Sequence, residues 1–246
     1  MAKLNVLKSG LSNKISIIIP AYQESKIIAQ TLYSTKKMIE SVGLDYELII
    51  VDDGSRDKTY YIAKDESNAN KKIKVFRNPA NKGKGYTIKT GFKHATGEII
   101  AYLDADLNLR PEIISLYIKN LKNADVVIGS KRHPQSNVIY PLHRRILSKS
   151  FNLLVRIFFK LSYSDTQCGQ KFFKRYVLED VLPNLRLNRY AFDVELLYNV
   201  NKKGYKIVEA PFYYVHKTDK INIINIVRMA LNLFGILNRI YITKSY

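Results

Sequence analysis

The chain has 246 residues, of which 46% are hydrophobic and 25% charged, as expected for an ordinary globular protein with one large domain. Its 40 lysines and arginines exceed its 21 aspartates and glutamates, giving a net charge of +19. The chain therefore needs an anionic partner such as nucleic acid, anionic lipid or a phosphorylated substrate. A single cysteine, Cys168, excludes an internal disulfide. The polar N-terminus does not resemble a signal peptide, and no uninterrupted apolar stretch predicts a membrane span.

Short β-branched runs alternate with segments of helical spacing through the first half of the chain. Strands are predicted at residues 15–19, 46–55 (running into a turn), 73–78, 98–106 and 125–130, and helices at 24–43, 57–70, 81–97 and 111–122. This alternation predicts an α/β fold with a mostly parallel, Rossmann-like sheet flanked by helices. Ligands of such sheets bind beyond the carboxyl ends of the strands, where the polar motifs of this sequence fall.

The stretch "AYLDADLNL" places Asp104 and Asp106 at the end of one predicted strand. Residues i and i+2 of an extended chain point to the same face, so both carboxylates can converge on one hard cation. Mg²⁺ or Mn²⁺ suits such a site, since these ions take one or two carboxylates and fill the rest with phosphate oxygens and water. The alternative is a solvated strand end or an Asx-turn.

Two further motifs follow strands. In "VDDGSRD", a carboxylate can face a nucleotide base; Asp53 is the preferred residue and Asp52 its neighbour, and the alternative is a simple Asp-Gly turn. In "PAYQE", Glu24 lies shortly after the strand, and Tyr22 can lie along a base or ribose.

The loop "NKGKG" contains glycines that allow the backbone to approach a phosphate, with charge from Lys82 and Lys84. Its spacing matches neither a P-loop nor the Gly-x-Gly-x-x-Gly fingerprint. By itself the loop is weak evidence, but it adds to the motifs at the strand ends.

In combination, "PAYQE", "VDDGS", "NKGKG" and "DAD" resemble glycosyltransferase family 2, inverting enzymes of the GT-A fold that use nucleotide sugars. The resemblance covers roughly residues 14–215. It implies a metal held by Asp104, Asp106 and Asn108. It also implies a nucleotide-sugar site made by Pro20, Tyr22, Glu24, Val51, Asp53, Lys84, Asp104, Ala105 and Asp106.

In the second half, "SDTQCGQKFFKR" (164–175) and "RYAFDVELLY" (189–198) resemble the polyprenyl-phosphate glycosyltransferases. The nearest branch is dolichyl-phosphate β-glucosyltransferase; dolichyl-phosphate mannose synthase diverges more here. The resemblance implies that Asp193 and Glu195 lie near the acceptor and that Lys220 reaches its phosphate. Gln170 stands where the glucosyl branch has Phe, and Asn108 where mannose synthases have a metal-binding Gln. The membrane anchor that precedes the domain in the eukaryotic glucosyl branch is also missing from this sequence.

Basic residues dominate the segment between Lys119 and Arg175, opposed only by Asp125 and Asp165. A cationic surface of this kind suits a substrate phosphate and an anionic membrane, and the alternative is a solvated basic face. The candidates for the acceptor phosphate here are Arg132, Arg144 and Lys149. Arg132 is also expected, with Lys84, to assist the leaving diphosphate.

Two segments have amphipathic spacing. Residues 146–162 fit either a helix in the membrane interface or a core helix with a polar back. The tail, residues 221–241, has a narrow polar stripe and a wide apolar surface that needs a cover: the membrane interface first, then the 146–162 helix or an oligomer contact. We therefore expect an extension (1–13), a catalytic domain (14–215, with donor half 14–110 and acceptor half 111–215) and an amphipathic C-terminal helix (216–246).

The expected reaction is attack by a polyprenyl phosphate oxygen on the anomeric carbon of UDP-glucose or GDP-mannose, at the cytoplasmic face of a membrane to which the enzyme binds peripherally. A phosphate monoester is already ionised near neutral pH, so no strong base is required; Asp193 is a catalytic candidate with base function open. Three alternatives remain: a family 2 enzyme with a soluble or polysaccharide acceptor, a sugar-1-phosphate nucleotidyltransferase, and a basic nucleic-acid-binding protein. No nucleic-acid motif is visible, so no nucleic-acid partner is expected.

Overall fold

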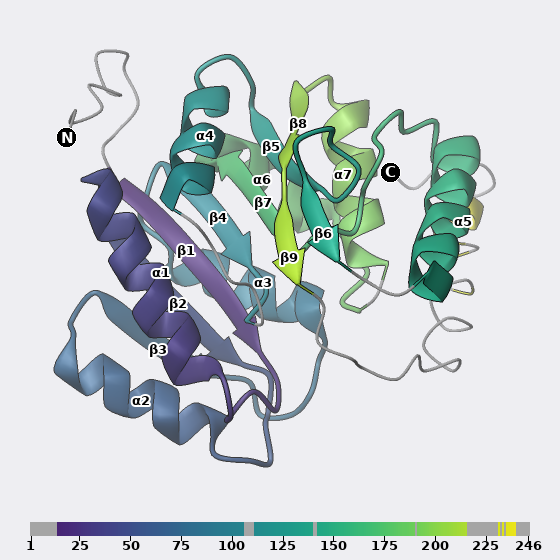
Figure 1. The fold of residues 1–246 in the computed structure, drawn as a ribbon. Helices are drawn as coiled ribbons and strands as arrows, with labels where there is room; N and C mark the ends of the chain where they lie inside the picture. The colour runs from purple at the N-terminus through teal and green to yellow at the C-terminus, as the bar shows by residue number, and fades with distance from the viewer. Residues whose placement is uncertain are drawn as a thin grey trace.

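The computed structural model describes residues 14–105, 111–139, 142–189, 191–215, 231, 233 and 235–239. A seven-stranded sheet has the order β3-β2-β1-β4-β7-β5-β8 (Figure 1). Its strands are β1 (Lys14–Ala21), β2 (Asp45–Asp52), β3 (Ile73–Arg77), β4 (Ile99–Leu103), β5 (Val126–Ser130), β7 (Gln170–Lys174) and β8 (Ile207–Pro211). A separate two-stranded sheet pairs β6 (Asn137–Ile139) with β9 (Tyr213–Val215).

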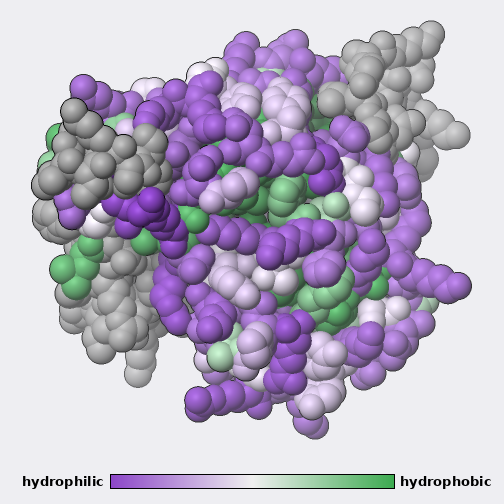
Figure 2. All heavy atoms as spheres, turned by 180° about the vertical axis from the view of Figure 1, so that it is seen from behind, coloured by the Kyte–Doolittle hydropathy of each residue, from purple (hydrophilic) through white to green (hydrophobic). Residues whose placement is uncertain are grey.

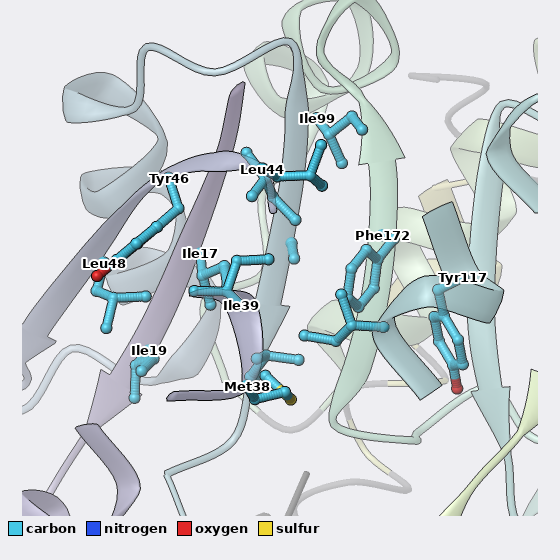
Figure 3. Packing of buried hydrophobic residues seen from close by; sticks show 14 of the residues in the cluster. Ile17, Ile19, Met38, Ile39, Leu44, Tyr46, Leu48, Ile99, Tyr117 and Phe172 are labelled. Carbon is cyan, nitrogen blue, oxygen red and sulfur yellow. The ribbon is translucent and has the colours of Figure 1, made fainter. Parts of the chain in front are cut away.

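Helices cover both faces of the large sheet. They are α1 (Ile28–Val42), α2 (Thr59–Ala69), α3 (Lys84–His94), α4 (Pro111–Leu121), α5 (Leu142–Phe159), α6 (Arg175–Val181) and α7 (Phe192–Lys202), with a 3-10 turn η1 (Leu182–Asn184). The cores of the two faces are distinct. Ile15, Ile17 and Ile19 pack with α1 and α4, as Figure 3 shows in part, while Ile18 packs on the opposite face with α3 and α7.

Burial on both faces explains why the strands read as continuous apolar runs rather than alternating ones. Every residue from Ile15 to Ile19 is enclosed, and so is every residue of β4. The predicted α/β class and the mostly parallel sheet are confirmed.

Strand β7 was not predicted. β7 is inserted antiparallel between β4 and β5, which makes the sheet mixed. Its sequence, "QKFFK", does not read as a buried strand because Lys171 stands in it, yet that lysine is fully buried. Strands β6, β8 and β9 and helices α6 and α7 were also not predicted, whereas the earlier elements agree to within a few residues.

The predicted strand 98–106 is too long. β4 ends at Leu103, and the chain turns at Ala105, whose carbonyl oxygen accepts a hydrogen bond from the Thr31 hydroxyl of α1. Asp104 is therefore the first residue beyond the strand. Asp106 lies outside the described residues, so its expected position on the same face as Asp104 stays a prediction.

The two amphipathic segments behave differently. On α5, Val155 and Phe159 are buried in the core, while many apolar side chains of the same helix are exposed. Of the tail, Leu233 and Ile236 are buried in the cluster that contains Val155 and Phe159, and Leu231 is 63% exposed. The described part of the tail therefore packs on the chain's own core, which was one of the three expected covers; the rest lies outside the described residues.

Candidate active site

The motifs at the ends of three strands come together because those strands are neighbours in a parallel arrangement. β1 pairs with β2 and with β4 in parallel, and the register places Pro20 opposite Val51 and Ala21 opposite Asp52. The ends of β1, β2 and β4 therefore lie at one edge of the sheet (Figure 1). This register brings the motifs that follow β1, β2 and β4 to the same edge of the sheet, as expected.

A cluster of alternating charges lies beyond β4. Lys84, the first residue of α3, places its ammonium 2.7 Å from Asp104 Oδ1 and 3.5 Å from Asp193 Oδ2 at the start of α7. Lys84 thus connects an acid of the predicted donor half with an acid of the predicted acceptor half. Sequence spacing did not indicate this contact, because Asp104 and Asp193 are 89 residues apart (193 − 104).

Two buried residues that the sequence analysis missed complete the cluster. Lys171 of β7 donates to Asp193 Oδ1 and to the carbonyl oxygen of Cys168, both at 2.7 Å. The Tyr102 hydroxyl of β4 donates to the same Asp193 oxygen at 2.5 Å. The sequence signal for Lys171 was its place between a glutamine and two phenylalanines. A lysine buried among such neighbours requires a carboxylate partner.

Two members of the cluster, Asp193 and Lys84, have shifted pKa values. Burial disfavours the carboxylate of Asp193, but the ammonium groups of Lys171 and Lys84 outweigh it and lower its pKa to about 2. Burial likewise opposes the charge of Lys84, but Asp104 and Asp193 outweigh it and raise the pKa of Lys84. The cluster of two lysines and two aspartates is formally neutral.

Gly169 fits directly against Asp104. Its carbonyl oxygen accepts the backbone N–H of Asp104 at 3.0 Å, and a Cβ at position 169 would lie 1.7 Å from Asp104 Oδ2. No side chain fits there without moving the carboxylate. The glycine of the "DTQCG" motif therefore leaves the space that the Asp104 carboxylate occupies at the end of β4. In the same motif, Cys168 is fully buried, and burial raises the pKa of its thiol to about 12, which agrees with a packing role.

The structure gives Asp53 a role that differs from direct base recognition. Its carboxylate accepts hydrogen bonds from Asn78 Nδ2 (2.8 Å) and from the backbone N–H groups of Lys82 (2.9 Å) and Gly83 (2.7 Å). Only 4% of Asp53 is exposed. Asp53 therefore holds the "NKGKG" loop in shape.

A cavity of about 850 Å³ opens beside this loop. It is lined by Tyr22, Tyr61 and the segments 54–57 and 77–81. Arg77 is fixed on one side of it by Asp52, with Nε 3.1 Å from Oδ2. Of the predicted nucleotide residues, Tyr22 is 41% exposed and lines the cavity, whereas Val51 is enclosed in the core and Glu24 begins the turn into α1.

The basic candidates follow β5 or lie on α5. Arg132 follows β5 and donates to the carbonyl oxygen of Ser164 and, at 3.3 Å, to the Ser148 hydroxyl of α5. Arg132 therefore connects the loop that carries Gly169 to α5. Lys149 is exposed on α5. Arg144 lies in α5 too, but its side chain is outside the described residues.

Glu195 is not placed as an acceptor-binding residue. Its side chain is fully buried, and its oxygens accept the backbone N–H groups of Arg186 and Leu187 (2.8–3.2 Å). Arg239 Nη2 lies 3.3 Å from Oε1. A carboxylate engaged in this way supports the loop before α7.

Of the three expected metal ligands, Asp104 lies within the described residues, and Asp106, Asn108 and the acceptor candidate Lys220 do not. Among the described residues, no three His, Cys, Asp or Glu side chains gather as a metal site. Asp104 nonetheless fits a hard cation: its side chain is 36% exposed, and a positive charge already lies 2.7 Å from one oxygen.

This fold, with acids at the ends of adjacent parallel strands, agrees with the comparison with known families. The model of the family described as Glycosyl transferase family 2 matches residues 16–182. The chain belongs to that family and is a glycosyltransferase of GT-A-like α/β fold. The resemblance read from the motifs is confirmed.

Relatives of established name agree. The chain is 30% identical over 236 residues to dolichyl-phosphate beta-glucosyltransferase ALG5C of Trichomonas vaginalis. The alignment covers 90% of this chain and 70% of that protein. It is 28% identical to glycosyltransferase AglD of Haloferax volcanii, with 84% of this chain and 34% of that protein covered.

Solved structures support the fold. Glucosyl-3-phosphoglycerate synthase from Mycobacterium tuberculosis, in complex with Mn²⁺, uridine diphosphate and phosphoglyceric acid, has a TM-score of 0.71 at 19% identity; 93% of this chain and 78% of that chain are covered. Mannosyl-3-phosphoglycerate synthase from Rubrobacter xylanophilus also has a TM-score of 0.71, at 15% identity, with 95% and 75% covered.

Proposed function

We propose that this glycosyltransferase transfers a hexose from a nucleotide sugar, UDP-glucose or GDP-mannose, to a polyprenyl phosphate and so makes a lipid-linked sugar donor. The observation that carries the proposal is Lys84, whose ammonium contacts both Asp104 and Asp193. A single cation between the donor-half acid and the acceptor-half acid is well situated where a diphosphate leaves and a phosphate enters. The names of the relatives, dolichyl-phosphate glucosyltransferases, support the lipid acceptor.

The donor is proposed to bind with its base in the cavity near Tyr22 and its diphosphate toward Lys84 and Asp104. The charge cluster is neutral by itself, so an incoming diphosphate adds uncompensated negative charge. Mg²⁺ or Mn²⁺ held by Asp104, Asp106 and Asn108 would neutralise the charge that develops on the leaving diphosphate. Solved structures of similar fold were obtained with Mn²⁺ or Mg²⁺ and uridine diphosphate, in support of this cofactor.

The acceptor phosphate is proposed to approach from the basic side, near Arg132, Arg144, Lys149 and Lys220. A phosphate monoester has its second pKa near ~6 and attacks as an anion without a strong base. In-line attack on the anomeric carbon breaks the bond to the nucleoside diphosphate and inverts the centre. Asp193 does not act as a base in this scheme, because its pKa is lowered to about 2 and its oxygens contact Lys171, Tyr102 and Lys84. It orients Lys84 instead.

A lipid acceptor requires a membrane-binding surface, and we propose that α5 supplies it. Seven large apolar side chains of this helix are at least 40% exposed: Leu142, Ile146, Leu147, Leu153, Leu154, Ile157 and Phe158. Exposed basic residues accompany them at positions 145, 149, 156 and 160, and residues 126–164 contain no acid. In Figure 2, apolar atoms reach the surface at the left edge, the side on which α5 lies.

The charge pattern matches an anionic lipid surface, and the apolar face matches the interface below it. No described helix meets the length and hydropathy of a membrane span. The charge pattern and the apolar face of α5 are the basis on which we propose peripheral attachment to the cytoplasmic face of a membrane.

The test is transfer of label into lipid. Purified protein with Mg²⁺ and a polyprenyl phosphate is incubated with radiolabelled UDP-glucose, GDP-mannose or UDP-N-acetylglucosamine in turn, and label is counted in the organic phase. We expect label from one donor and none from the Asp104→Ala variant. Hydrolysis of the donor, or transfer to a water-soluble acceptor, without lipid label would refute the lipid acceptor but keep the glycosyltransferase assignment.

A further inference from the structure

Two loops from opposite halves of the chain clasp each other. The donor loop (residues 78–85) contains "NKGKG", and the clamp loop (residues 185–189) joins η1 to α7. Gly85 N–H donates to the carbonyl oxygen of Asn188 at 2.8 Å. The guanidinium of Arg189 donates to the side-chain and main-chain oxygens of Asn81 at 3.0 and 2.9 Å.

The fit between these loops is close. A Cβ at Gly83 would lie 2.4 Å from the carbonyl oxygen of Asn188, and a Cβ at Gly85 would lie 2.4 Å from the ring of Phe192. The backbone of the donor loop thus lies directly against the clamp loop. A displacement of the clamp loop would be transmitted to the donor loop.

Glu195 holds the clamp loop from inside the protein. Glu195 lies in the first turn of α7 and is fully buried. Its carboxylate accepts hydrogen bonds from the backbone N–H groups of Arg186 and Leu187. From α3, Lys89 donates to the carbonyl oxygen of Leu185 at 2.6 Å. A buried carboxylate without a nearby cation carries a large desolvation cost, so the order of this loop depends on what balances Glu195.

One cation that balances Glu195 comes from the C-terminal segment, in addition to the charge of Lys89 on α3. Arg239 Nη2 lies 3.3 Å from Glu195 Oε1, and its side chain is 19% exposed. Residues 235–239 are helical, and Ile236 on this helix is fully buried in the core, so the guanidinium is delivered by a docked element. Contacts run from Arg239 through Glu195 and the clamp loop to the donor loop, which Asp53 holds from the other side.

We infer that Arg239 is a positioning residue for the donor site and that docking of the C-terminal helix sets the order of the donor loop. The inference rests on the proposed function in one respect, that the donor loop binds the nucleotide sugar. Arg239 touches neither Asn81 nor Gly85 in this scheme; it acts through Glu195. Undocking of the C-terminal helix would loosen both loops and weaken donor binding.

The test compares Arg239→Met, Arg239→Lys and Glu195→Gln with the wild type in the full chain. Amide hydrogen exchange of residues 78–85 and 185–189 is measured by mass spectrometry, and UDP and GDP binding with Mg²⁺ is measured by calorimetry. In Arg239→Met we expect faster exchange in both loops and a Kd about tenfold higher for the nucleotide that binds, the size of one coupled contact. Arg239→Lys keeps the positive charge, so its loop exchange rates and its nucleotide affinity should both lie close to those of the wild type.

Glu195→Gln keeps the shape and one acceptor oxygen, so it should fold and should loosen the same loops. The double variant should be no worse than the more severe single variant, because both changes break one link. Lys203→Met is the matched control: it removes one cation from an exposed pair with Asp180 (2.6 Å) and should change neither readout.

Unchanged exchange in both loops of Arg239→Met and Glu195→Gln would overturn the inference. Faster exchange with unchanged nucleotide affinity would keep the clamp but refute the donor role of the loop, so the two failures are distinguishable. Additive effects in the double variant would also overturn the proposed order of contacts.

Discussion

Single residues of this site act mainly on one another. Asp104 has three immediate constraints: the ammonium of Lys84, the backbone of Gly169, and the end of the strand that carries it. Asp193, for which a base role was left open, is instead an ionised partner of two lysines and a tyrosine. The residues that we propose to contact substrate are thus held in place by other side chains and by the backbone.

Gly169→Ala tests this arrangement at the scale of one methyl group. The added Cβ would overlap Asp104 Oδ2, so the carboxylate must move by an ångström or more, and kcat should fall about 100-fold. Far-UV circular dichroism should stay unchanged. Gly235→Ala is the control, because among the residues that the structure describes only Arg239 Nη1, at 4.0 Å, lies near its new Cβ. A Gly169→Ala enzyme with wild-type kcat would contradict the tight fit around Asp104.

At the scale of elements, Glu47 joins three strands and a turn at the amino-terminal end of the sheet. Glu47 lies on β2. Its carboxylate accepts hydrogen bonds from Ser16 of β1 (2.6 Å) and from Thr96 before β4, and it forms an ion pair with Lys74 of β3 (2.7 Å). This end of the sheet lies opposite the active-site edge, so the cluster stabilises the fold without taking part in the chemistry.

The stability of this cluster should depend on pH. Burial raises the pKa of Glu47, but the bonds from Lys74, Ser16 and Thr96 outweigh it and lower the pKa from 4.5 to about 2. The folded state therefore gains stability that is complete above pH ~4.5 and is lost as the pH falls toward 2. Glu47→Gln should lower the free energy of unfolding by roughly 3 kcal/mol at pH 7, and the difference from wild type should shrink at pH 3.

Urea unfolding at the two pH values measures this difference. Glu98→Gln is the matched control, since Glu98 is exposed. A Glu47→Gln deficit of equal size at pH 7 and pH 3 would show that the lost contacts are not electrostatic.

At the scale of the whole molecule, the proposed binding to an anionic membrane rests on the charge of +19 and on the exposed face of α5. In the attachment that we propose, basic residues would draw the protein to the surface, and the apolar side chains would retain it there. The buried side of α5, with Val155 and Phe159, keeps the helix fixed to the enzyme. Arg132, which we propose to lie near the acceptor, donates to Ser148 of the same helix and so connects the proposed membrane surface with the proposed site.

The triple variant Ile146→Ser, Leu153→Ser, Ile157→Ser removes three side chains that are 55–61% exposed. Its affinity for vesicles of mixed neutral and anionic lipid should fall about 100-fold, at roughly 1 kcal/mol for each partly inserted side chain. Its Tm should change little because these residues are exposed. Salt should weaken vesicle binding of the wild type, since exposed charges are screened.

Sedimentation with vesicles measures both effects. Tyr33→Ser, which removes a side chain that is 58% exposed on α1, is the control for a lost surface hydrophobe. Vesicle binding by the triple variant at the wild-type level would refute α5 as the membrane surface.

Local sequence was sufficient for the class of fold, the order of the early elements and the acids at the strand ends. Apolar runs, turns and short motifs lie within a few residues of one another, so their geometry follows from the backbone of one segment. Asp104, Lys84 and Asp193 were all named as site residues on this basis and on the family resemblance. The roles of Asp53 and Glu195 were not evident, because a carboxylate that faces a ligand and one that holds a loop look identical in a sequence.

Long-range pairing decided the rest. β7 runs antiparallel between β4 and β5, and only this placement brings Gly169 against Asp104 and Lys171 beneath Asp193. The contact of Arg239 with Glu195 likewise depends on where the C-terminal helix docks. Such contacts join residues tens of positions apart, and their energy comes from burying charge beside opposite charge, which no local pattern records.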